Sequence, residues 1–251
     1  MRPPTDTADD PIDALLHSEA STADQLMPCP YLDDQLACLP LRLPRGSLSG
    51  VDVDLLLATG FRRSGLFWYR TRCPACNQCV PVRVPVHTMR PSRSQRRVVK
   101  RAQVDLKRQV EVPRSDAVRL ELFNRHRLER GLGERALSLR DYEEFLVHSS
   151  AVSLELSFWL GQRLVAVSIA DLGEQSISAV YTYFDPSYCK YSLGTLAVLQ
   201  LADLAASCQR ELLYLGYYVR ANPHLNYKAR FKPQQCLRDG QWQDHQESAL
   251  L

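Results

Sequence analysis

Two tyrosines and an aspartate that could do chemistry lie close together in the segment Tyr181-Thr-Tyr183-Phe-Asp185-Pro186. In a strand Tyr181 and Tyr183 share one face, and Asp185 would follow the end of that strand. The Asp185 carboxylate could orient or deprotonate an incoming amine, and the tyrosines could stack on a nucleic-acid base or bond to a ribose. The alternative reading is an Asp-Pro turn next to two core aromatic residues.

A second block, residues 214–233, combines aromatic and basic residues. Tyr217 and Tyr218 point to opposite faces if this block begins as a strand, and Asn226 and Tyr227 follow as candidate substrate-binding residues. Gly194 begins an expected helix, where backbone N–H groups could approach a ligand closely. Three basic side chains could pair with phosphates or a carboxylate: Lys228, Arg230 and Lys232.

Cysteines form the third constellation. Cys73-x-x-Cys76 has the spacing of zinc ligands, Cys79 adds a third thiol, and Cys29 could lie beside them in space. Four thiolates suit a structural zinc ion or an iron–sulfur cluster, whereas the alternative is a group of reduced thiols without metal. The other four are expected to be ordinary buried thiols: Cys38, Cys189, Cys208 and Cys236.

Basic residues are segregated along the chain. The net charge is only +3, yet no acidic residue occurs between Asp54 and Asp105, or between Glu211 and Asp239, while both segments are rich in arginine and lysine. Such segregation indicates a surface for a polyanion, and the predominance of arginine favours nucleic acid. A solvated basic face without a partner is the alternative.

The elements that must position these residues indicate an α+β fold. Helices are expected at 52–60, 92–102, 116–131, 139–149 and 193–208, and strands at 65–70, 80–86 and 211–219. The segment 153–184 predicts a three-stranded antiparallel meander with turns at Gly161-Gln162 and Gly173-Glu174. Flanking helices on an antiparallel or mixed sheet are compatible with the N-acetyltransferase type of acyltransferase fold.

Composition predicts three regions along the 251 residues: a disordered acidic tail (1–24), a cysteine-containing basic lobe (25–110) and an acyltransferase-like domain (111–251). With 45% hydrophobic and 24% charged residues, a buried core is expected. The chain has no apolar run of membrane-spanning length, and its acidic start does not fit a secretory signal. We therefore expect a cytoplasmic protein with no membrane partner.

Together these blocks resemble the arginyl-tRNA–protein transferase family. The resemblance rests on Tyr181-x-Tyr183-x-Asp185-Pro186, on Leu215-Gly-Tyr217-Tyr218 with Tyr227-Lys228 and Phe231-Lys-Pro233, and on Cys29-Pro-Tyr31 with the cysteine cluster. It spans roughly residues 27–237. The short length, the segment CPACNQCVPVRV and Leu32, where the arginyl branch has a second cysteine, are similar to the bacterial leucyl branch of that family.

This resemblance implies an enzyme that moves leucine from leucyl-tRNA to the N-terminal amine of proteins beginning with Asp or Glu, marking them for degradation. An aminoacyl ester is already activated, so such an enzyme mainly positions an amine against a carbonyl and requires no cofactor. The acceptor carboxylate needs a cation that distinguishes it from an amide. The candidates for that cation are Arg83, Arg220 and Lys228.

Three other functions remain open. An arginyl donor would keep the same chemistry with another charged tRNA. An acyl-CoA-dependent N-acetyltransferase would need a pyrophosphate loop before its helix, and Lys190-Tyr-Ser-Leu-Gly194 fits that loop poorly. A non-enzymatic RNA-binding protein would explain the basic segments but would leave the two aromatic blocks without a purpose.

Overall fold

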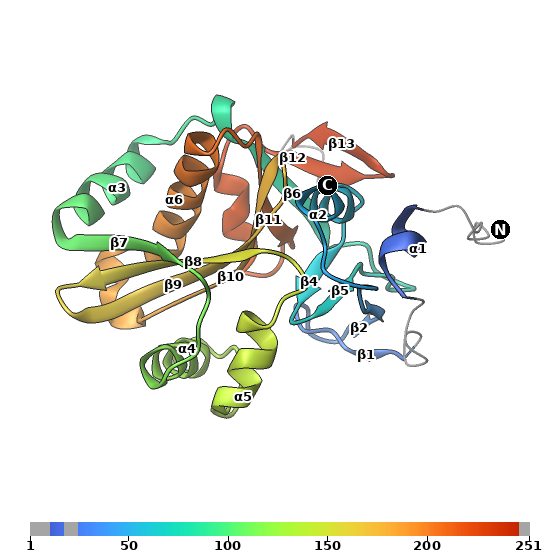
Figure 1. The fold of residues 1–251 in the computed structure, drawn as a ribbon, viewed down its shortest axis with the longest axis horizontal. Helices are drawn as coiled ribbons and strands as arrows, with labels where there is room; N and C mark the ends of the chain where they lie inside the picture. The colour runs from blue at the N-terminus through green and yellow to red at the C-terminus, as the bar shows by residue number, and fades with distance from the viewer. Residues whose placement is uncertain (1–10, 18–24, 246–251) are drawn as a thin grey trace.

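An eight-stranded mixed sheet forms the centre of the computed structural model, which describes residues 11–17 and 25–245 (Figure 1). Its strand order is β13-β12-β6-β11-β10-β9-β8-β7. The strands are β6 (Val80–Pro85), β7 (Leu106–Glu111), β8 (Ser153–Leu160), β9 (Arg163–Leu172), β10 (Ser176–Phe184), β11 (Leu212–Tyr218), β12 (Gln235–Arg238) and β13 (Gln241–Asp244). The α+β class with a mixed sheet is thereby confirmed.

Strands β8, β9 and β10 form the expected antiparallel meander. The β8–β9 turn consists of Gly161 and Gln162, and Gly161 has φ +58°, a conformation that glycine adopts without steric cost. β9 and β10 are joined at residues 173–175, as the Gly173-Glu174 pair predicted. Turn chemistry therefore sets where the three strands reverse, and bulges between Phe158 and Trp159 and between Ala179 and Tyr181 shift the pairing register along them.

Strands β10 and β11 are the one parallel pair among the described strands, and they separate after a short contact. Only Ser176–Ser178 pair with Leu212–Tyr214, although both strands continue beyond those residues. Each strand also has a bulge, between Ala179 and Tyr181 in β10 and between Tyr214 and Gly216 in β11. The bulges turn the two strands away from each other, so the sheet opens between them.

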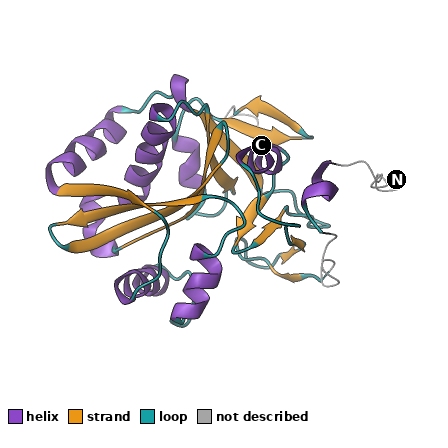
Figure 2. Cartoon of the chain, in the orientation of Figure 1, coloured by secondary structure: helices purple, strands orange, loops and turns teal. Residues whose placement is uncertain are grey.

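Helices cover both faces of the sheet (Figure 2). One face packs against α3 (Arg93–Asp105) and α6 (Leu193–Ser207), and the other against α4 (Ala117–Glu129), α5 (Leu139–Tyr142) and the π-helical turn η2 (Glu143–Val147). The predicted capping of α3 by Ser92 is confirmed, because its hydroxyl accepts from the Gln95 amide while the Gln95 side chain accepts from the Ser92 amide. None of the described helices is long and apolar enough to cross a bilayer.

Residues before β6 form two small sheets and two helices beside the large sheet (Figure 1). The elements are α1 (Pro11–Leu15), β1 (Met27–Pro28), β2 (Leu36–Ala37), β3 (Leu41–Arg42), α2 (Gly50–Ala58), β4 (Arg62–Ser64) and β5 (Phe67–Tyr69). Buried Arg63 donates to Asp171 of β9 at 2.7 Å, and Arg62 donates to the Ala179 carbonyl of β10 at 2.9 Å. Two buried arginines thus tie this part of the chain to the sheet.

The predicted disordered tail falls mostly outside the described residues, at 1–10 and 18–24. Residues 11–17 are described, and there Ile12 and Leu16 are buried against α2 and its neighbours. The proposed division at residue 110 stays a prediction. The hydrogen-bonded sheet itself runs across that position, because β6 precedes it, β7 contains it, and both strands pair with strands that follow it.

Candidate active site

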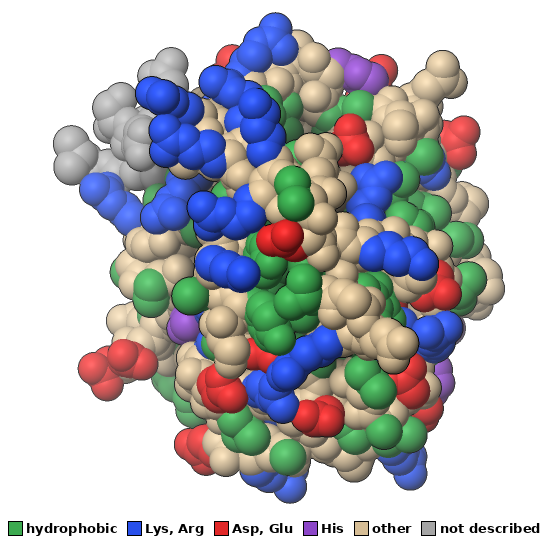
Figure 3. Space-filling model, turned by 90° about the vertical axis from the view of Figure 1, so that its left-hand side faces the viewer, with side chains coloured by type: hydrophobic (Ala, Val, Ile, Leu, Met, Phe, Trp, Pro, Cys, Tyr) green, Lys and Arg blue, Asp and Glu red, His purple; other side chains and the backbone are tan. Residues whose placement is uncertain are grey.

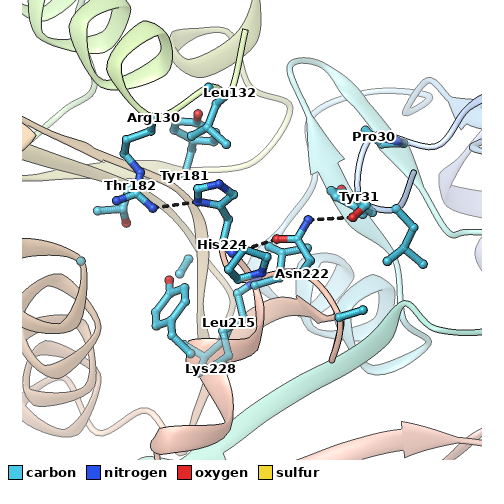
Figure 4. Close-up of a pocket in the computed structure, with 18 of the residues that line it drawn as sticks. Pro30, Tyr31, Arg130, Leu132, Tyr181, Thr182, Leu215, Asn222, His224 and Lys228 are labelled. Atoms are coloured by element: carbon cyan, nitrogen blue, oxygen red, sulfur yellow. Dashed lines mark hydrogen bonds between the residues drawn. The ribbon is translucent and has the colours of Figure 1, made fainter. Parts of the chain in front are cut away.

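A cavity of about 1310 Å³ lies where β10 and β11 separate. One wall comes from residues 29–35 and 75–78 of the cysteine-containing region, and the opposite wall from the end of α4, β10 and the start of α6. The segment 221–228, which contains the start of the 3₁₀-helix η4 (Asn226–Arg230), closes a third side. Segments distant in sequence therefore build one pocket, which Figure 4 shows from within.

The two tyrosines of the first block share a face of β10, as predicted, but differ in access. Tyr181 lines the cavity, and burial raises the pKa of its hydroxyl. Tyr183 is fully buried, and its hydroxyl lies 2.6 Å from that of Tyr142. Both tyrosine rings pack against Phe123 of α4, but only Tyr181 also lines the cavity and can meet a ligand.

Asp185 is 1% exposed and begins the 3₁₀-helix η3 (Pro186–Tyr191). One carboxylate oxygen accepts from the Ser187 amide at 3.0 Å, and the other from Arg125 and Arg163, both at 2.9 Å. Burial opposes ionisation, but these hydrogen bonds outweigh it and lower the pKa of Asp185. Asp185 is not among the residues that line the cavity, so its geometry favours positioning the β10–η3 corner over deprotonating an amine.

We expect Asp185→Asn to lower the free energy of unfolding by about 1–3 kcal/mol, because it weakens a buried charged hydrogen-bond network. The aminoacyl transfer that the sequence motifs imply should fall less than about tenfold in the folded fraction of this variant, since general-base catalysis by a residue contributes more than that. Urea unfolding and initial transfer rates measure the two effects. A folded variant without transfer would restore Asp185 as the candidate base.

Lys228 is a buried lysine in the cavity wall. It is 8% exposed, and its Nζ donates to the Tyr217 carbonyl at 2.6 Å. Burial, with a smaller contribution from nearby Arg62, lowers the pKa of Lys228 to about 7. No carboxylate of the described residues forms an ion pair with Lys228. An anion bound beside this buried amine would therefore favour its protonated, charged form.

The remaining residues of the second block lie at different depths. Tyr227 lines the third side of the cavity, and Gly194, at the start of α6, lies in the wall that α4 and β10 also form. Asn226 donates to the Arg220 carbonyl at 3.2 Å and so shapes the loop after β11. Tyr217 and Tyr218 face opposite sides of β11, as predicted, and neither lines the cavity.

Arg83 and Arg220 also lie off the cavity wall. The Arg83 guanidinium donates to Gln235 at 2.8 Å and to the Tyr214 hydroxyl at 3.1 Å, and lies 4.1 Å from the centre of the Trp242 ring. It therefore joins β6 to the C-terminal hairpin β12–β13. Of the three candidates for a carboxylate-binding cation, only Lys228 reaches the cavity.

The structure brings the two basic segments of the sequence side by side. The Gln95 side chain of α3 donates to the Arg230 carbonyl at 3.1 Å, and the Arg90 amide donates to the Lys232 carbonyl at 2.8 Å. Figure 3 shows lysine and arginine side chains gathered on the upper part of one face. The exposed basic residues of α3 are Arg93, Arg96, Arg97, Lys100 and Arg101.

The four cysteines of the cluster are close enough to affect one another. Burial, with smaller contributions from the neighbouring Cys29, Cys73 and Cys76, raises the pKa of the Cys79 thiol to about 12. Within residues 11–17 and 25–245, no group of three cysteine, histidine or acidic side chains has an arrangement that could hold a metal ion. A zinc ion or iron–sulfur cluster on these thiols stays a prediction. Of the four thiols expected to be buried, Cys38 and Cys236 are, but Cys189 and Cys208 are exposed, so the prediction for those two is wrong.

Several cavity residues carried no signal in the sequence. Arg130 follows α4, and its Nη2 lies 2.8 Å from Nδ1 of His224 (Figure 4). Asn222 connects this pair to the opposite wall, because its side chain accepts from the His224 amide and donates to the Tyr31 carbonyl, both at 2.8 Å. Isolated histidine and arginine residues in a basic chain give no pattern, so only the tertiary structure identifies them.

Comparisons with known proteins show which family the chain resembles in sequence. The family model described as the N terminus of arginine-tRNA-protein transferase matches residues 27–97, and the model of its C terminus matches residues 118–238. The chain is 39% identical to the aspartate/glutamate leucyltransferase of Acinetobacter baylyi, over 85% of this chain and 80% of that protein. It is 36% identical to the enzyme of the same name from a Shewanella species, over 87% and 92%.

Among solved structures, FemX has a TM-score of 0.44 and 9% identity, covering 71% of this chain and 63% of that chain. The two family models together span the cysteine-containing region, the parallel strand pair and η4. The cavity has walls from both matched segments. The chain therefore belongs to the arginine-tRNA-protein transferase family.

Proposed function

We propose that this protein transfers leucine from leucyl-tRNA to the N-terminal amine of proteins that begin with Asp or Glu, in the cytoplasm. The relatives, which match 85–87% of the chain, are named for leucyl transfer and for aspartate and glutamate, and the matching family models are named for transfer between tRNA and protein. The observation that carries the proposal is the single cavity built from both family-matched segments. It combines Tyr181, Gly194 and Lys228 from one segment with Tyr31 and Cys76 from the other.

The reaction needs little beyond positioning. The neutral acceptor amine attacks the ester carbonyl and loses a proton to solvent as the new amide bond forms; the ester bond breaks, and the ribose oxygen of the tRNA leaves as a hydroxyl with a proton from solvent. A free α-amine has a pKa near 7.7–8, so a neutral fraction is present at physiological pH. Lys228 is suited to bind the anionic end of the tRNA, and Tyr181 and Tyr227 offer rings for the terminal base.

The transfer assay that tests this proposal uses tRNA charged separately with leucine, arginine or phenylalanine. Each is mixed with peptides that begin with Asp, Glu, Arg or Lys, and the mass of every peptide is measured. Leucine should be added to the Asp and Glu peptides alone. Arginine transfer to the same peptides would instead favour the arginyl branch, and no transfer from any tRNA would overturn the proposal.

The basic surface of α3 should bind the tRNA body. We expect Arg93→Glu with Arg97→Glu to weaken binding of uncharged tRNA by at least about tenfold at low salt, because two phosphate contacts become repulsions. The salt dependence should also become shallower. Filter binding between about 50 and 200 mM salt measures both effects. Arg140→Glu, which changes an exposed side chain of α5, is the control, and an equal loss in that variant would contradict a specific role for α3.

A further inference from the structure

Arginine and lysine are scarce on the cavity wall, although the chain is rich in both. Of the described residues that line it, only Arg130 and Lys228 carry a strong base, and Asp33 is the single carboxylate. Asp33 is exposed, and Figure 4 shows Arg130 and Lys228 well apart, with His224 between them. The cavity thus has two separate cationic positions, and Lys228 occupies one.

The Arg130 guanidinium is held in place on two sides. Its Cζ lies 5.1 Å from the centre of the Phe184 ring, and its Nη2 donates to His224 Nδ1 at 2.8 Å. Burial, and next the charge of Arg130, lower the pKa of His224, which therefore stays neutral and accepts this hydrogen bond. Asn222 fixes the His224 backbone, so the ring and the guanidinium keep their relative orientation.

The same guanidinium lacks an anion. No carboxylate of the described residues forms an ion pair with Arg130, in contrast to Arg119 and Arg125 of α4, the helix that ends just before it. Its Nε is buried without a hydrogen-bond partner, and no described residue accepts from its Nη1. An arginine side chain oriented in this way offers N–H groups in the planar arrangement that a carboxylate accepts.

We propose that Arg130, oriented by His224, forms the subsite that binds the side-chain carboxylate of the acceptor's first residue. The inference rests on the proposed function and adds the group that selects the acceptor. A carboxylate in this position would accept from Nη1 and from the second hydrogen of Nη2, while the acceptor amine points into the cavity. An Asn or Gln side chain would offer neither the charge nor two acceptor oxygens, so it would leave Arg130 unpaired.

A phosphate of the tRNA is the competing ligand for Arg130. Phosphate contacts are expected on the exposed arginines of α3, whereas Arg130 lies against a ring inside the pocket. A small side chain at a peptide terminus can enter such a place more easily than a ribose-phosphate chain. The experiment below separates the two ligands.

The variant Arg130→Gln tests the subsite with two peptides that differ only in beginning with Asp or Asn. We expect kcat/KM for the Asp peptide to fall by at least about 100-fold, which is the usual size of losing one partner of a desolvated charge pair. The value of kcat/KM for the Asn peptide should change less than about threefold, because the Asn side chain has no carboxylate to pair with Arg130. Arg130→Lys keeps the charge without the planar arrangement, so an intermediate preference for Asp is expected.

Arg127→Gln is the matched control. Arg127 lies in the last turn of α4, shortly before Arg130, and its Cζ is 5.6 Å from the centre of the Phe123 ring, but it does not line the cavity. The ratio of kcat/KM for the Asp peptide to that for the Asn peptide should be the same in Arg127→Gln as in the unmodified protein. Equal losses on both peptides in Arg130→Gln, or a raised KM for charged tRNA alone, would overturn the proposal in favour of a structural or a tRNA-binding role.

Peptide binding measured without tRNA keeps this test independent of the proposed function. Fluorescence anisotropy should show that the unmodified protein prefers the Asp peptide, and that Arg130→Gln loses this preference. Preferred binding of the Asp peptide without transfer from any charged tRNA would overturn the proposed function and leave the subsite intact. Transfer to Asp peptides with an unchanged Asp preference in both Arg130 variants would overturn the subsite alone.

Discussion

Replacing Lys228 by methionine is expected to raise the KM for leucyl-tRNA by about 10- to 100-fold, because the cavity loses the cation suited to the anionic tRNA end. The kcat at saturating tRNA should change less. Lys232→Met is the control, since Lys232 belongs to the same basic segment but does not line the cavity. Initial transfer rates at several tRNA concentrations separate the two constants, and an unchanged KM would contradict this role of Lys228.

The same substitution should stabilise the fold. The pKa of Lys228 is about 7 in the folded protein, against 10.5 for an exposed lysine, so between these pH values the unfolded chain binds the extra proton. The free energy of unfolding of the unmodified protein therefore rises as pH increases from 7 to 10.5, and the contribution of neutral Lys228 is lost as pH falls over the same range. Methionine removes this penalty but leaves the Tyr217 carbonyl without its donor, so a net gain of about 1–3 kcal/mol is expected at pH 7.

Urea unfolding at several pH values checks the sign of this effect. The gain of Lys228→Met should be largest at pH 7 and below, and should disappear near pH 10.5. A gain that does not depend on pH would show that packing, and not the buried ammonium, causes it. If Lys228→Met is more stable but binds leucyl-tRNA more weakly, then Lys228 is kept for substrate binding although it destabilises the fold.

Loss of Arg119 should have the largest effect on stability. Arg119 is 1% exposed, and its Nε lies 2.9–3.0 Å from both carboxylate oxygens of Glu155, which is fully buried. Its Nη1 also donates at 2.6 Å to Asp116, the N-cap of α4. Arg119→Met leaves the Glu155 charge buried without a partner, so we expect a loss of about 3–5 kcal/mol.

A double variant tests this explanation. Arg119→Met with Glu155→Leu removes both charges, so most of the lost stability should return, because no unpaired ion remains. Urea unfolding of the single and double variants completes the cycle. A double variant as unstable as Arg119→Met alone would show that packing at this position matters more than charge pairing. The result bears on the site, since this ion pair anchors α4 to β8 and Arg130 follows α4.

Local features of the chain were predicted well. The cap at Ser92, the Gly161-Gln162 turn and the five principal helices depend on neighbouring residues, so their signals are contained in short segments. The edge strand β7 and the hairpin β12–β13 were not expected. The sequence of β7, LKRQVE, has charged residues and a weak alternation, and its pairing with β8 is set by the meander.

The site was predicted in part. The sequence determined the family, the two aromatic blocks and the presence of Tyr181, Tyr227 and Lys228, because these residues lie in continuous motifs. Only the tertiary structure separated Tyr181 from buried Tyr183, and it assigned Arg83 to the C-terminal hairpin. Strand alternation gives the face of a side chain, but it does not tell what covers that face.

The cavity itself is a product of the tertiary structure. It exists because bulges in β10 and β11 end their pairing after three residues, and because the cysteine-containing region packs across the opening. Arg130 and His224 are 94 residues apart and meet only when α4 and the loop after β11 reach the same wall. Contacts of such long range leave no periodicity in one sequence. The chain thus specifies its chemistry in local motifs, whereas its selectivity depends on packing between distant elements.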